Sequence, residues 1–247
     1  MTNAGIFDYV LLALILILPL VEWLLYGPRC ARAIRERVSG ARGRLYRAEV
    51  IALWAVTFGV LALWIAEARP WGLLHLGASS ALRFGSGLFV ATIIVVLLVL
   101  QMQKVQKTLQ RPRAVAKLRE KFASVDLVVP ETDRERRGFW LLSVTAGICE
   151  EVIYRGFLLW LFTAWAGLLA AILISSAVFG FMHIYLGVAQ VPRTAIVGFV
   201  LALIVVASGS LWPAMVIHAA IDLSSGEIGF RVARASLAIT NPPPLTS

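Results

Sequence analysis

The chain has 247 residues, of which 60% are hydrophobic and only 15% charged, and its mean hydropathy is +0.83. This composition is typical of polytopic membrane proteins and excludes an ordinary soluble domain. The net charge of +9 could indicate nucleic-acid binding, but the cations gather between apolar segments, as orientation in a membrane requires. We therefore expect a lipid bilayer around the chain and no nucleic acid as a partner.

Apolar runs long enough to cross a hydrocarbon layer about 30 Å thick recur along the chain. The first three predicted spans are Gly5–Tyr26, Glu49–Ala66 and Gly85–Met102, and the last four are Gly138–Phe162, Ala164–Ile184, Thr194–Ala207 and Leu211–Phe230. The predicted fold class is all-α, a single polytopic transmembrane helix bundle. It has about seven spans, or eight if residues 71–83 re-enter the membrane.

The connecting segments differ sharply in charge. Seven arginines follow the first span and ten Lys or Arg residues follow the third, whereas only Arg69 and Arg83 follow the second. Because strongly basic loops stay in the cytoplasm, we expect the N-terminus outside and the C-terminus inside. A composition rich in Ala, Leu and Arg favours a bacterial inner membrane. Asp8 lies near the start of the first span, where water is close.

One connecting segment has two interpretations. Residues 114–125 contain several cations and apolar residues at helical spacing. They predict either a basic amphipathic helix that lies on anionic lipid or a solvated connecting helix. No internal repeat is evident, which disfavours a transporter built from inverted halves.

Glu150, Glu151 and Arg155 lie near the middle of the span Gly138–Phe162. A carboxylate at the centre of a membrane costs about 2.5–3.5 kcal/mol, so such groups indicate function by default. Residues four apart share a helix face, and we therefore expect Glu151 and Arg155 to form a structural pair. Glu150 points elsewhere and has no local cation. Cys149 is interpreted as a small apolar filler rather than a nucleophile.

Two histidines and one further acid lie in the later spans. His183 ends the fifth span, and His218 and Asp222 share a face of the seventh because they are four residues apart. Buried polar groups of this kind turn inward and meet. With Glu150 they could form a general-base site that activates water, with an imidazole aiding the water or stabilising an oxyanion.

The same residues also permit a zinc site. His183, His218 and either Glu150 or Asp222 could bind Zn²⁺, which would acidify a bound water. The HExxH pattern is absent, so the ligands would come from separate helices. The spacing of the residues does not choose between the two chemistries.

Three motifs on successive spans resemble a known family. Glu150 to Arg155 has the pattern EExxxR, Phe179 to His183 has FxxxH, and residues 209–222 are GSLWPAMVIHAAID. In this order they are similar to the CAAX protease and bacteriocin-processing (CPBP, or Abi) family, which includes the type II CAAX prenyl endopeptidases. The resemblance divides one membrane domain into spans one to three (1–137), a catalytic core in the last four spans (138–230) and a C-terminal tail (231–247).

The resemblance implies an intramembrane endopeptidase whose site opens towards the cytosol and whose substrate is a peptide or a membrane protein. In this family the positions of Glu150 and His183 activate water, and those of His218 and Asp222 stabilise the oxyanion. The family is regarded as metal-independent, so the resemblance implies no cofactor, with zinc as the alternative. Glu151 and Arg155 would support the helix, and Phe179 would pack against the site. The family commonly has Asn at the position of Asp222. An ionised Asp cannot donate a hydrogen bond, so Asp222 must be protonated, orient His218 or bind a metal.

Two other functions fit buried Glu, His and Asp residues. A proton-coupled transporter would use them as a relay and would move substrate without a nucleophilic water. A non-catalytic membrane interaction or immunity protein would keep the motifs without turnover. Replacing Glu150 and His183 distinguishes these alternatives from a protease.

Overall fold

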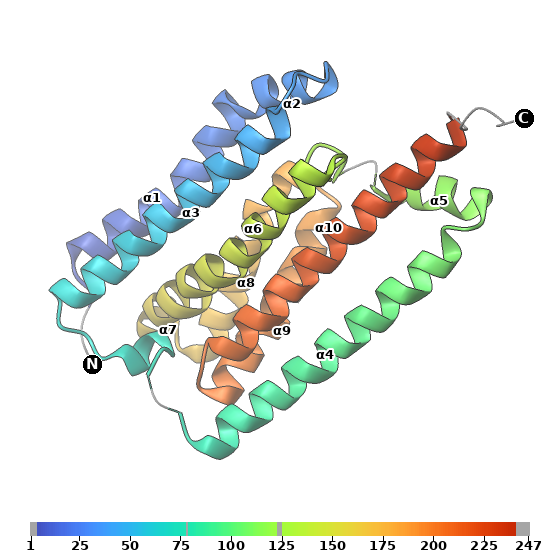
Figure 1. Cartoon of the computed structure of the whole chain (residues 1–247). Helices are drawn as coiled ribbons and strands as arrows, with labels where there is room; N and C mark the ends of the chain where they lie inside the picture. Colours follow the sequence, from blue (N-terminus) through green and yellow to red (C-terminus); the bar gives the residue numbers. More distant parts are fainter. Residues whose placement is uncertain (1–3, 78, 123–124, 241–247) are drawn as a thin grey trace, which may run out of the picture.

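The computed structural model describes residues 4–77, 79–122 and 125–240, which form helices joined by short connections (Figure 1). The long helices are α1 (Ile6–Leu25), α3 (Ala41–Ala66), α4 (Ala81–Thr108), α6 (Asp133–Glu150), α8 (Leu168–Met182), α9 (Gln190–Ser208) and α10 (Trp212–Thr240). Shorter elements are α2 (Gly27–Arg35), the 3₁₀ turn η1 (Trp71–Leu74), α5 (Pro112–Phe122), the π-helix η3 (Glu151–Leu158), α7 (Leu159–Ala166) and the 3₁₀ turn η4 (Ile184–Leu186). No strand occurs in these residues, and the all-α prediction is confirmed for them.

Several helices have the length and composition of membrane spans. Among the described residues, α3, α4 and α9 are long and apolar enough to cross a bilayer, and Ile6–Val21 and α8 are shorter apolar helices. Their outer faces expose large apolar side chains, among them Phe58, Phe89 and Leu97, which are 59%, 67% and 58% exposed. Water would be an unfavourable solvent for such a surface, whereas lipid is a favourable one. The chain is an integral membrane protein.

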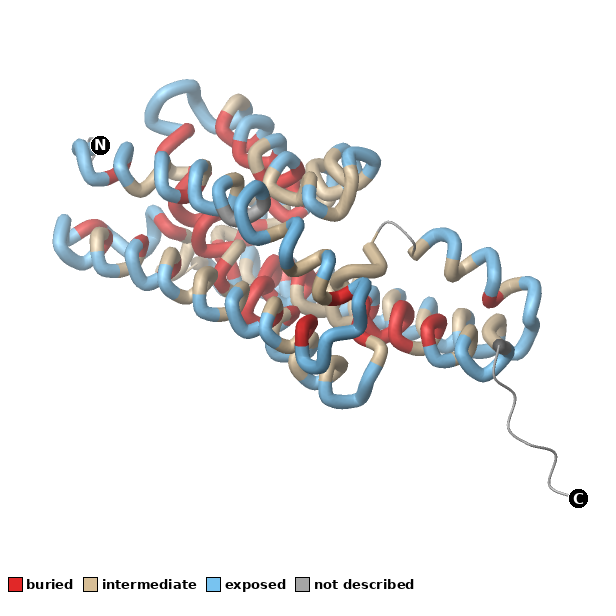
Figure 2. The backbone as a smooth tube through the Cα atoms, turned by 90° about the horizontal axis from the view of Figure 1, so that it is seen from above, coloured by how far each residue is buried: buried red, intermediate tan, exposed pale blue. Residues whose placement is uncertain are grey.

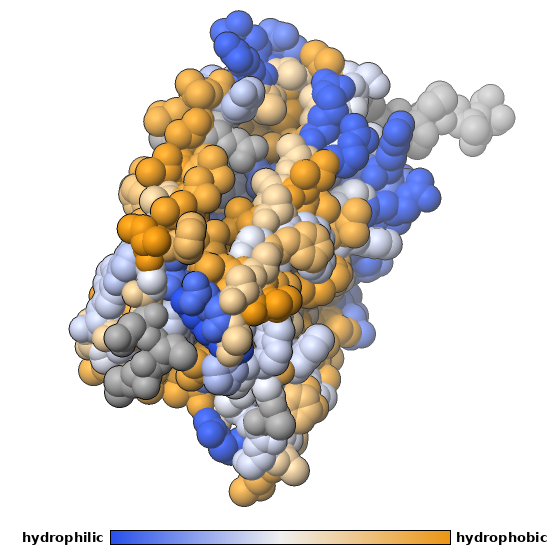
Figure 3. Space-filling view, turned by 90° about the vertical axis from the view of Figure 1, so that its left-hand side faces the viewer, coloured by the Kyte–Doolittle hydropathy of each residue, from blue (hydrophilic) through white to orange (hydrophobic). Residues whose placement is uncertain are grey.

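The polar elements gather at one end of the bundle. In Figure 1, α2, α5 and the C-terminal end of α10 lie at one end, and the N-terminus and the segment between α3 and α4 lie at the other. A view from the side of α1 shows apolar side chains over much of the surface and strongly hydrophilic ones concentrated at the upper end (Figure 3). This distribution separates a basic end from an apolar body.

A composite central helix organises the packing. Helix α6, the π-helix η3 and α7 follow one another without a break. Helix α6 packs against α3 and α10, and α7 packs against α8, which in turn packs against α9. Phe157, Leu158 and Leu161 are completely buried, and the buried stretches of backbone lie inside the bundle (Figure 2). The segment that carries Glu150 and Glu151 is therefore the core of the fold.

The first basic segment is more helical than its polarity predicts. Residues 27–35 form α2, a left-handed turn at Gly40 follows, and α3 begins at Ala41, eight residues before the predicted span. Hydropathy detects only the part of a helix that lies in lipid, whereas arginine is a good helix former outside it. The helical turns therefore extend beyond the apolar stretch.

In the described residues of the segment 71–83, which could re-enter the membrane as an eighth span, the turn η1 precedes the start of α4 and no other helix occurs. Leu74 of η1 is buried and contacts the position of Gly156 in the π-helix. The segment thus closes one end of the core.

The predicted C-terminal tail is partly helical. Helix α10 continues to Thr240, ten residues beyond the end of the predicted span at Phe230. Phe230, Val232 and Ala233 are buried, because α5 packs along this part of α10. Residues 241–247, also assigned to the tail from the sequence, lie outside the described residues.

Helix α5 uses its apolar face inside the protein. Val115 is 1% exposed and α5 packs against α10, whereas Arg113, Lys117 and Lys121 are exposed. A helix with Val115 buried against α10 and its cations exposed is compatible with both interpretations of this segment, a connecting helix and a basic helix that lies on anionic lipid.

Asp8 is buried, contrary to the expectation that water surrounds it. Its two carboxylate oxygens accept hydrogen bonds from Arg69 Nη1 at 2.6 Å and Nη2 at 2.7 Å, and both side chains are almost completely buried. The guanidinium also lies 4.6 Å from the ring of Trp160 and 5.3 Å from that of Trp64. No local pattern in the sequence indicates this pair, because its members are 61 positions apart.

Removing the arginine of this pair should destabilise the protein strongly. Arg69→Ala leaves the carboxylate of Asp8 buried without a counter-charge, which costs about 3–5 kcal/mol. We expect this loss in the free energy of unfolding, measured by denaturant and thermal unfolding of the protein in nanodiscs. Arg44→Ala, at an exposed arginine, is the matched control and should change it by less than about 0.5 kcal/mol. Equal effects of the two variants would contradict the importance of the pair.

Candidate active site

The helix that carries the two glutamates changes type at the site. Helix α6 begins with a capping box in which Thr132 and Glu135 satisfy each other's backbone N–H groups, and it ends at Glu150. From Glu151 to Leu158 the chain is a π-helix, whose wider turn is frequent at functional sites. The sequence predicted a uniform α-helix here. All eight residues of the π-helix are buried, so packing against neighbouring helices stabilises the wide turn.

Two glycines let the helices of the site approach closely. A Cβ atom on Gly147 would lie 2.8 Å from the backbone nitrogen and the Cβ of Ala219, so α6 and α10 touch beside His218. A Cβ atom on Gly180 would lie 2.6 Å from the carbonyl oxygen of Val191, which brings α8 against α9 beside His183. Small residues at such crossings are the usual means of close helix packing in membranes.

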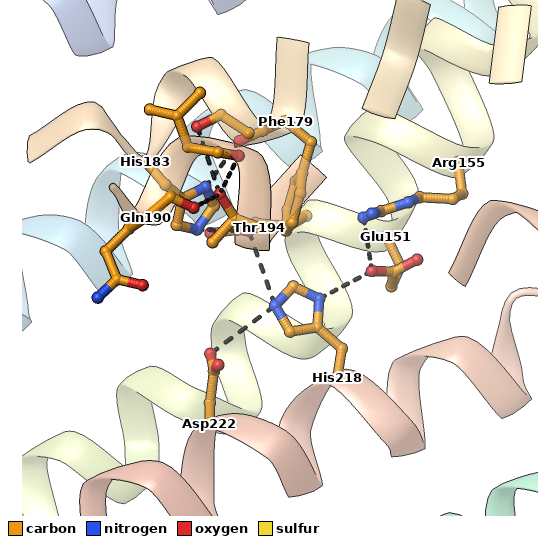
Figure 4. Close-up of polar contacts among 11 residues, drawn as sticks. Glu151, Arg155, Phe179, His183, Gln190, Thr194, His218 and Asp222 are labelled. Carbon is orange, nitrogen blue, oxygen red and sulfur yellow. Dashed lines mark hydrogen bonds and ion pairs between the residues drawn. The ribbon is translucent and has the colours of Figure 1, made fainter. Parts of the chain in front are cut away.

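The carboxylate of Glu151 joins two helices. Its Oε1 accepts hydrogen bonds from Arg155 Nη1 and from His218 Nδ1, both at 2.7 Å (Figure 4). The pairing of Glu151 with Arg155 is the one that their spacing predicts, whereas the bond to His218 was not foreseen. All three side chains are at most 4% exposed. The carboxylate therefore fixes the ring of His218, with Nδ1 carrying a proton and Nε2 turned into the site.

His183 is held in the same way by the backbone. Its Nδ1 lies 2.7 Å from the carbonyl oxygen of Phe179. Because a carbonyl only accepts hydrogen bonds, Nδ1 must carry the proton, and Nε2 of the neutral ring keeps a free lone pair. The ring of Phe179 lies 4.6 Å from that of His183 and 4.2 Å from the Arg155 guanidinium. Phe179 is thus packed between the two polar parts of the site.

Glu150 faces both histidines across short gaps. Its Oε2 lies 4.0 Å from His183 Nε2 and 3.8 Å from His218 Nε2, and no described group donates a hydrogen bond to it. These separations are too long for direct hydrogen bonds but suit a bridging water. Asp222 is the fourth member, with its Oδ2 3.7 Å from His218 Nε2. The structure therefore brings together Glu150, His183, His218 and Asp222.

These side chains do not form a metal-binding set as they stand. Within the described part of the chain, no group of three or more His, Cys, Asp or Glu residues is arranged to hold a metal ion. The histidines are oriented through Nδ1, as zinc ligands often are, but the same arrangement serves a pair that binds water. The geometry gives no specific support to zinc.

Two tyrosines of this region were missed by the sequence analysis. Tyr185 stacks on His183 with 6.0 Å between ring centres, and Tyr154 meets Phe179 edge to face at 5.1 Å. Their only sequence signal was nearness to the motifs. Cys149 is completely buried beside Glu150 in the chain, and it and Cys30 are free thiols.

Comparison with known proteins agrees with the motifs. No curated protein and no solved structure gives a significant match to the chain. The model of a family described as type II CAAX prenyl endopeptidase, Rce1-like, matches residues 136–224, which contain all four clustered side chains. The resemblance to CAAX proteases is thereby confirmed, because residues 136–224 of this chain are similar to the Rce1-like family of type II CAAX prenyl endopeptidases.

Proposed function

We propose that the protein is an intramembrane endopeptidase that hydrolyses a peptide bond with a water activated by Glu150 and His183. One observation carries the proposal. Glu150 Oε2 and His183 Nε2 face each other across 4.0 Å, and the hydrogen bond from Nδ1 to Phe179 leaves that Nε2 as an acceptor. Two acceptors at this separation are suited to bind the two hydrogens of one water. The match to a family of endopeptidases gives the reaction class.

The chemistry uses Glu150 as a base and then as an acid. Glu150 takes a proton from the water while His183 orients it, and the hydroxide oxygen bonds to the carbonyl carbon of the substrate. The carbonyl π electrons move to oxygen and form a tetrahedral oxyanion. When the C–N bond breaks, Glu150 returns its proton to the leaving nitrogen. The products are a carboxylic acid and an amine, and the base is regenerated.

His218 is the proposed donor to the oxyanion. Its Nε2 faces the centre of the site and its Nδ1 lies 2.7 Å from Glu151 Oε1, so in the imidazolium form the ring presents an N–H group to the site. An N–H group directed at the developing charge stabilises the transition state more than the ground state. Glu151 and Arg155 act as positioning residues, because they hold the ring through Nδ1.

The proposed membrane arrangement follows from the charges. We propose seven spans in a bacterial inner membrane, with the N-terminus outside, the C-terminus in the cytoplasm and the site open to the cytosol. The arginine-rich α2, the basic α5 and the C-terminal end of α10 lie at the same end of the bundle, in agreement with this orientation (Figure 1).

Glu150→Gln should abolish cleavage and keep the fold. Glutamine has nearly the same shape but cannot accept the proton, so we expect kcat to fall by about 10²–10⁴-fold. The measurement is proteolysis of a peptide or membrane-protein substrate by the purified protein in nanodiscs. Glu120→Gln, at an exposed acid of α5, is the control and should keep full activity. Cleavage retained by the Glu150 variant would refute the mechanism and favour an interaction protein or transporter.

Asp222→Asn should raise the rate of cleavage. Asparagine keeps the shape of the side chain, removes a negative charge beside the oxyanion and adds an N–H donor. We expect kcat to increase by up to about tenfold, equivalent to about 1.4 kcal/mol. A loss of activity would instead mean that the carboxylate orients His218 or binds a metal.

Removing metal ions should leave cleavage unchanged. A strong chelator should lower neither kcat nor kcat/KM, because the proposed base and donor are side chains. The metal content of the purified, active protein is measured in the same preparation. Stoichiometric zinc together with chelator-sensitive cleavage would overturn the metal-free mechanism and assign His183, His218 and a carboxylate as ligands.

A further inference from the structure

A large apolar cavity lies between the N-terminal helices and the rest of the bundle. Its volume is about 580 Å³, which is within the range of pockets that enclose a ligand. Helices α1, α2 and α3 build most of its wall, and residues from 125–128, the π-helix η3 and 182–186 close it. None of the four clustered side chains of the candidate active site lines it. The cavity is therefore a separate site, to which the proposed reaction assigns no role.

The cavity has about the depth of one leaflet of a bilayer. Its lining extends along α1 from Leu14 to Leu24. This distance is about 15 Å at a rise of about 1.5 Å per residue, half of a hydrocarbon layer about 30 Å thick. Most of the lining is aliphatic, and the carboxylate of Glu49, which also lines it, already interacts within the protein. Such a space favours a hydrocarbon chain over water.

Helix α2 separates the cavity from a second hollow that is lined by arginines. The residues of α2 that line the cavity recur at helical spacing, which gives the helix an apolar face: Gly27, Cys30, Ala31 and Ile34. Arg32 and Arg35 line the second hollow. Pro28 and Ala31 line both spaces, so the two adjoin across this one helix.

The arginine face of α2 has a large excess of positive charge. Residues 27–40 contain four arginines and one acid, Glu36. Arg32 and Arg35 are exposed, and among the described residues no acid forms an ion pair with either of them. Guanidinium groups bind phosphate through paired hydrogen bonds, and basic clusters at the end of an apolar helix attract anionic lipid headgroups. A phosphate group is thus the ligand that suits the second hollow.

We infer that α2 binds one anionic phospholipid, with an acyl chain in the apolar cavity and its phosphate between Arg32 and Arg35. The glycerol backbone lies over Pro28 and Ala31, where the two spaces adjoin. A zwitterionic phospholipid binds more weakly, because the arginines repel the cation of its headgroup. A soluble phosphate ester binds more weakly as well, because it has no chain to bury in the cavity.

Lipid binding to the purified, delipidated protein in detergent is measured by native mass spectrometry. The ligands are phosphatidylglycerol, phosphatidylcholine with the same chains, and glycerol phosphate. We expect a single tightly bound phosphatidylglycerol, with a Kd at least about tenfold lower than that of phosphatidylcholine, and no binding of glycerol phosphate. Arg32→Gln together with Arg35→Gln should raise the Kd for phosphatidylglycerol to that for phosphatidylcholine. Arg113→Gln together with Lys117→Gln, which removes two exposed cations of α5 at the same end of the bundle, should leave it unchanged (Figure 1).

The thiol of Cys30 reports whether the chain enters the cavity. Cys30 lines the cavity and is partly buried, whereas Cys149, the other free cysteine, is completely buried. A small maleimide should therefore label Cys30, and Cys30→Ser gives the background. Phosphatidylglycerol at ten times its Kd should slow the labelling by about tenfold. Arg32→Gln together with Arg35→Gln should remove this protection at the same lipid concentration.

Three outcomes would overturn the inference. Equal affinities for phosphatidylglycerol and phosphatidylcholine would mean that the arginines do not bind the headgroup. Equal losses in the α2 and α5 double variants would mean that the lipid responds only to the net charge of the protein. Binding of phosphatidylglycerol without protection of Cys30 would place the lipid outside the cavity.

Discussion

The site depends on one buried carboxylate, that of Glu151. It accepts hydrogen bonds from an arginine one turn along its own helix and from a histidine on α10. A buried charged group costs free energy unless it is paired. Removing either partner would therefore leave the Glu151 carboxylate with an uncompensated desolvation cost. The bond to His218 also ties α10 to the central helix. The hydrogen bond that stabilises the buried Glu151 carboxylate therefore also orients the imidazole of His218 towards the neighbouring Glu150.

His183 and His218 are oriented in the same way by different hydrogen-bond acceptors. Each ring is fixed through Nδ1, in one case by a backbone carbonyl and in the other by a carboxylate. The first acceptor is a neutral carbonyl oxygen, and the second is a carboxylate. In the proposed reaction the ring of His183 accepts a hydrogen bond from the water, and that of His218 donates one to the oxyanion. The two roles in the proposed reaction thus follow from what lies behind each ring, and both present Nε2 to the same carboxylate oxygen.

The sequence predicted the helical class, the approximate positions of the long helices and the four clustered side chains, because long apolar runs and intramembrane charges are strong local signals. The pairing of Glu151 with Arg155 also followed from spacing within one helix. The features that it missed are contacts between residues far apart in the chain and structures that depend on packing. The partner of Asp8 is 61 positions away, Glu151 meets a histidine 67 positions away, and the extension of α3 lies outside the apolar window. The π-helix was equally hidden, since it is stabilised by the packing of eight buried residues.

The π-helix makes the site depend on the number of residues in this segment of the chain. Each turn between Glu151 and Leu158 contains more residues than an α-helical turn, so this stretch of the span holds extra chain without a loop. Deleting one residue there would let the segment relax to an α-helix. The side chains of the wide turn would then point in new directions relative to one another, because an α-helical turn holds about 3.6 residues. The residue count across this segment is thus tied to the directions in which its charged side chains point.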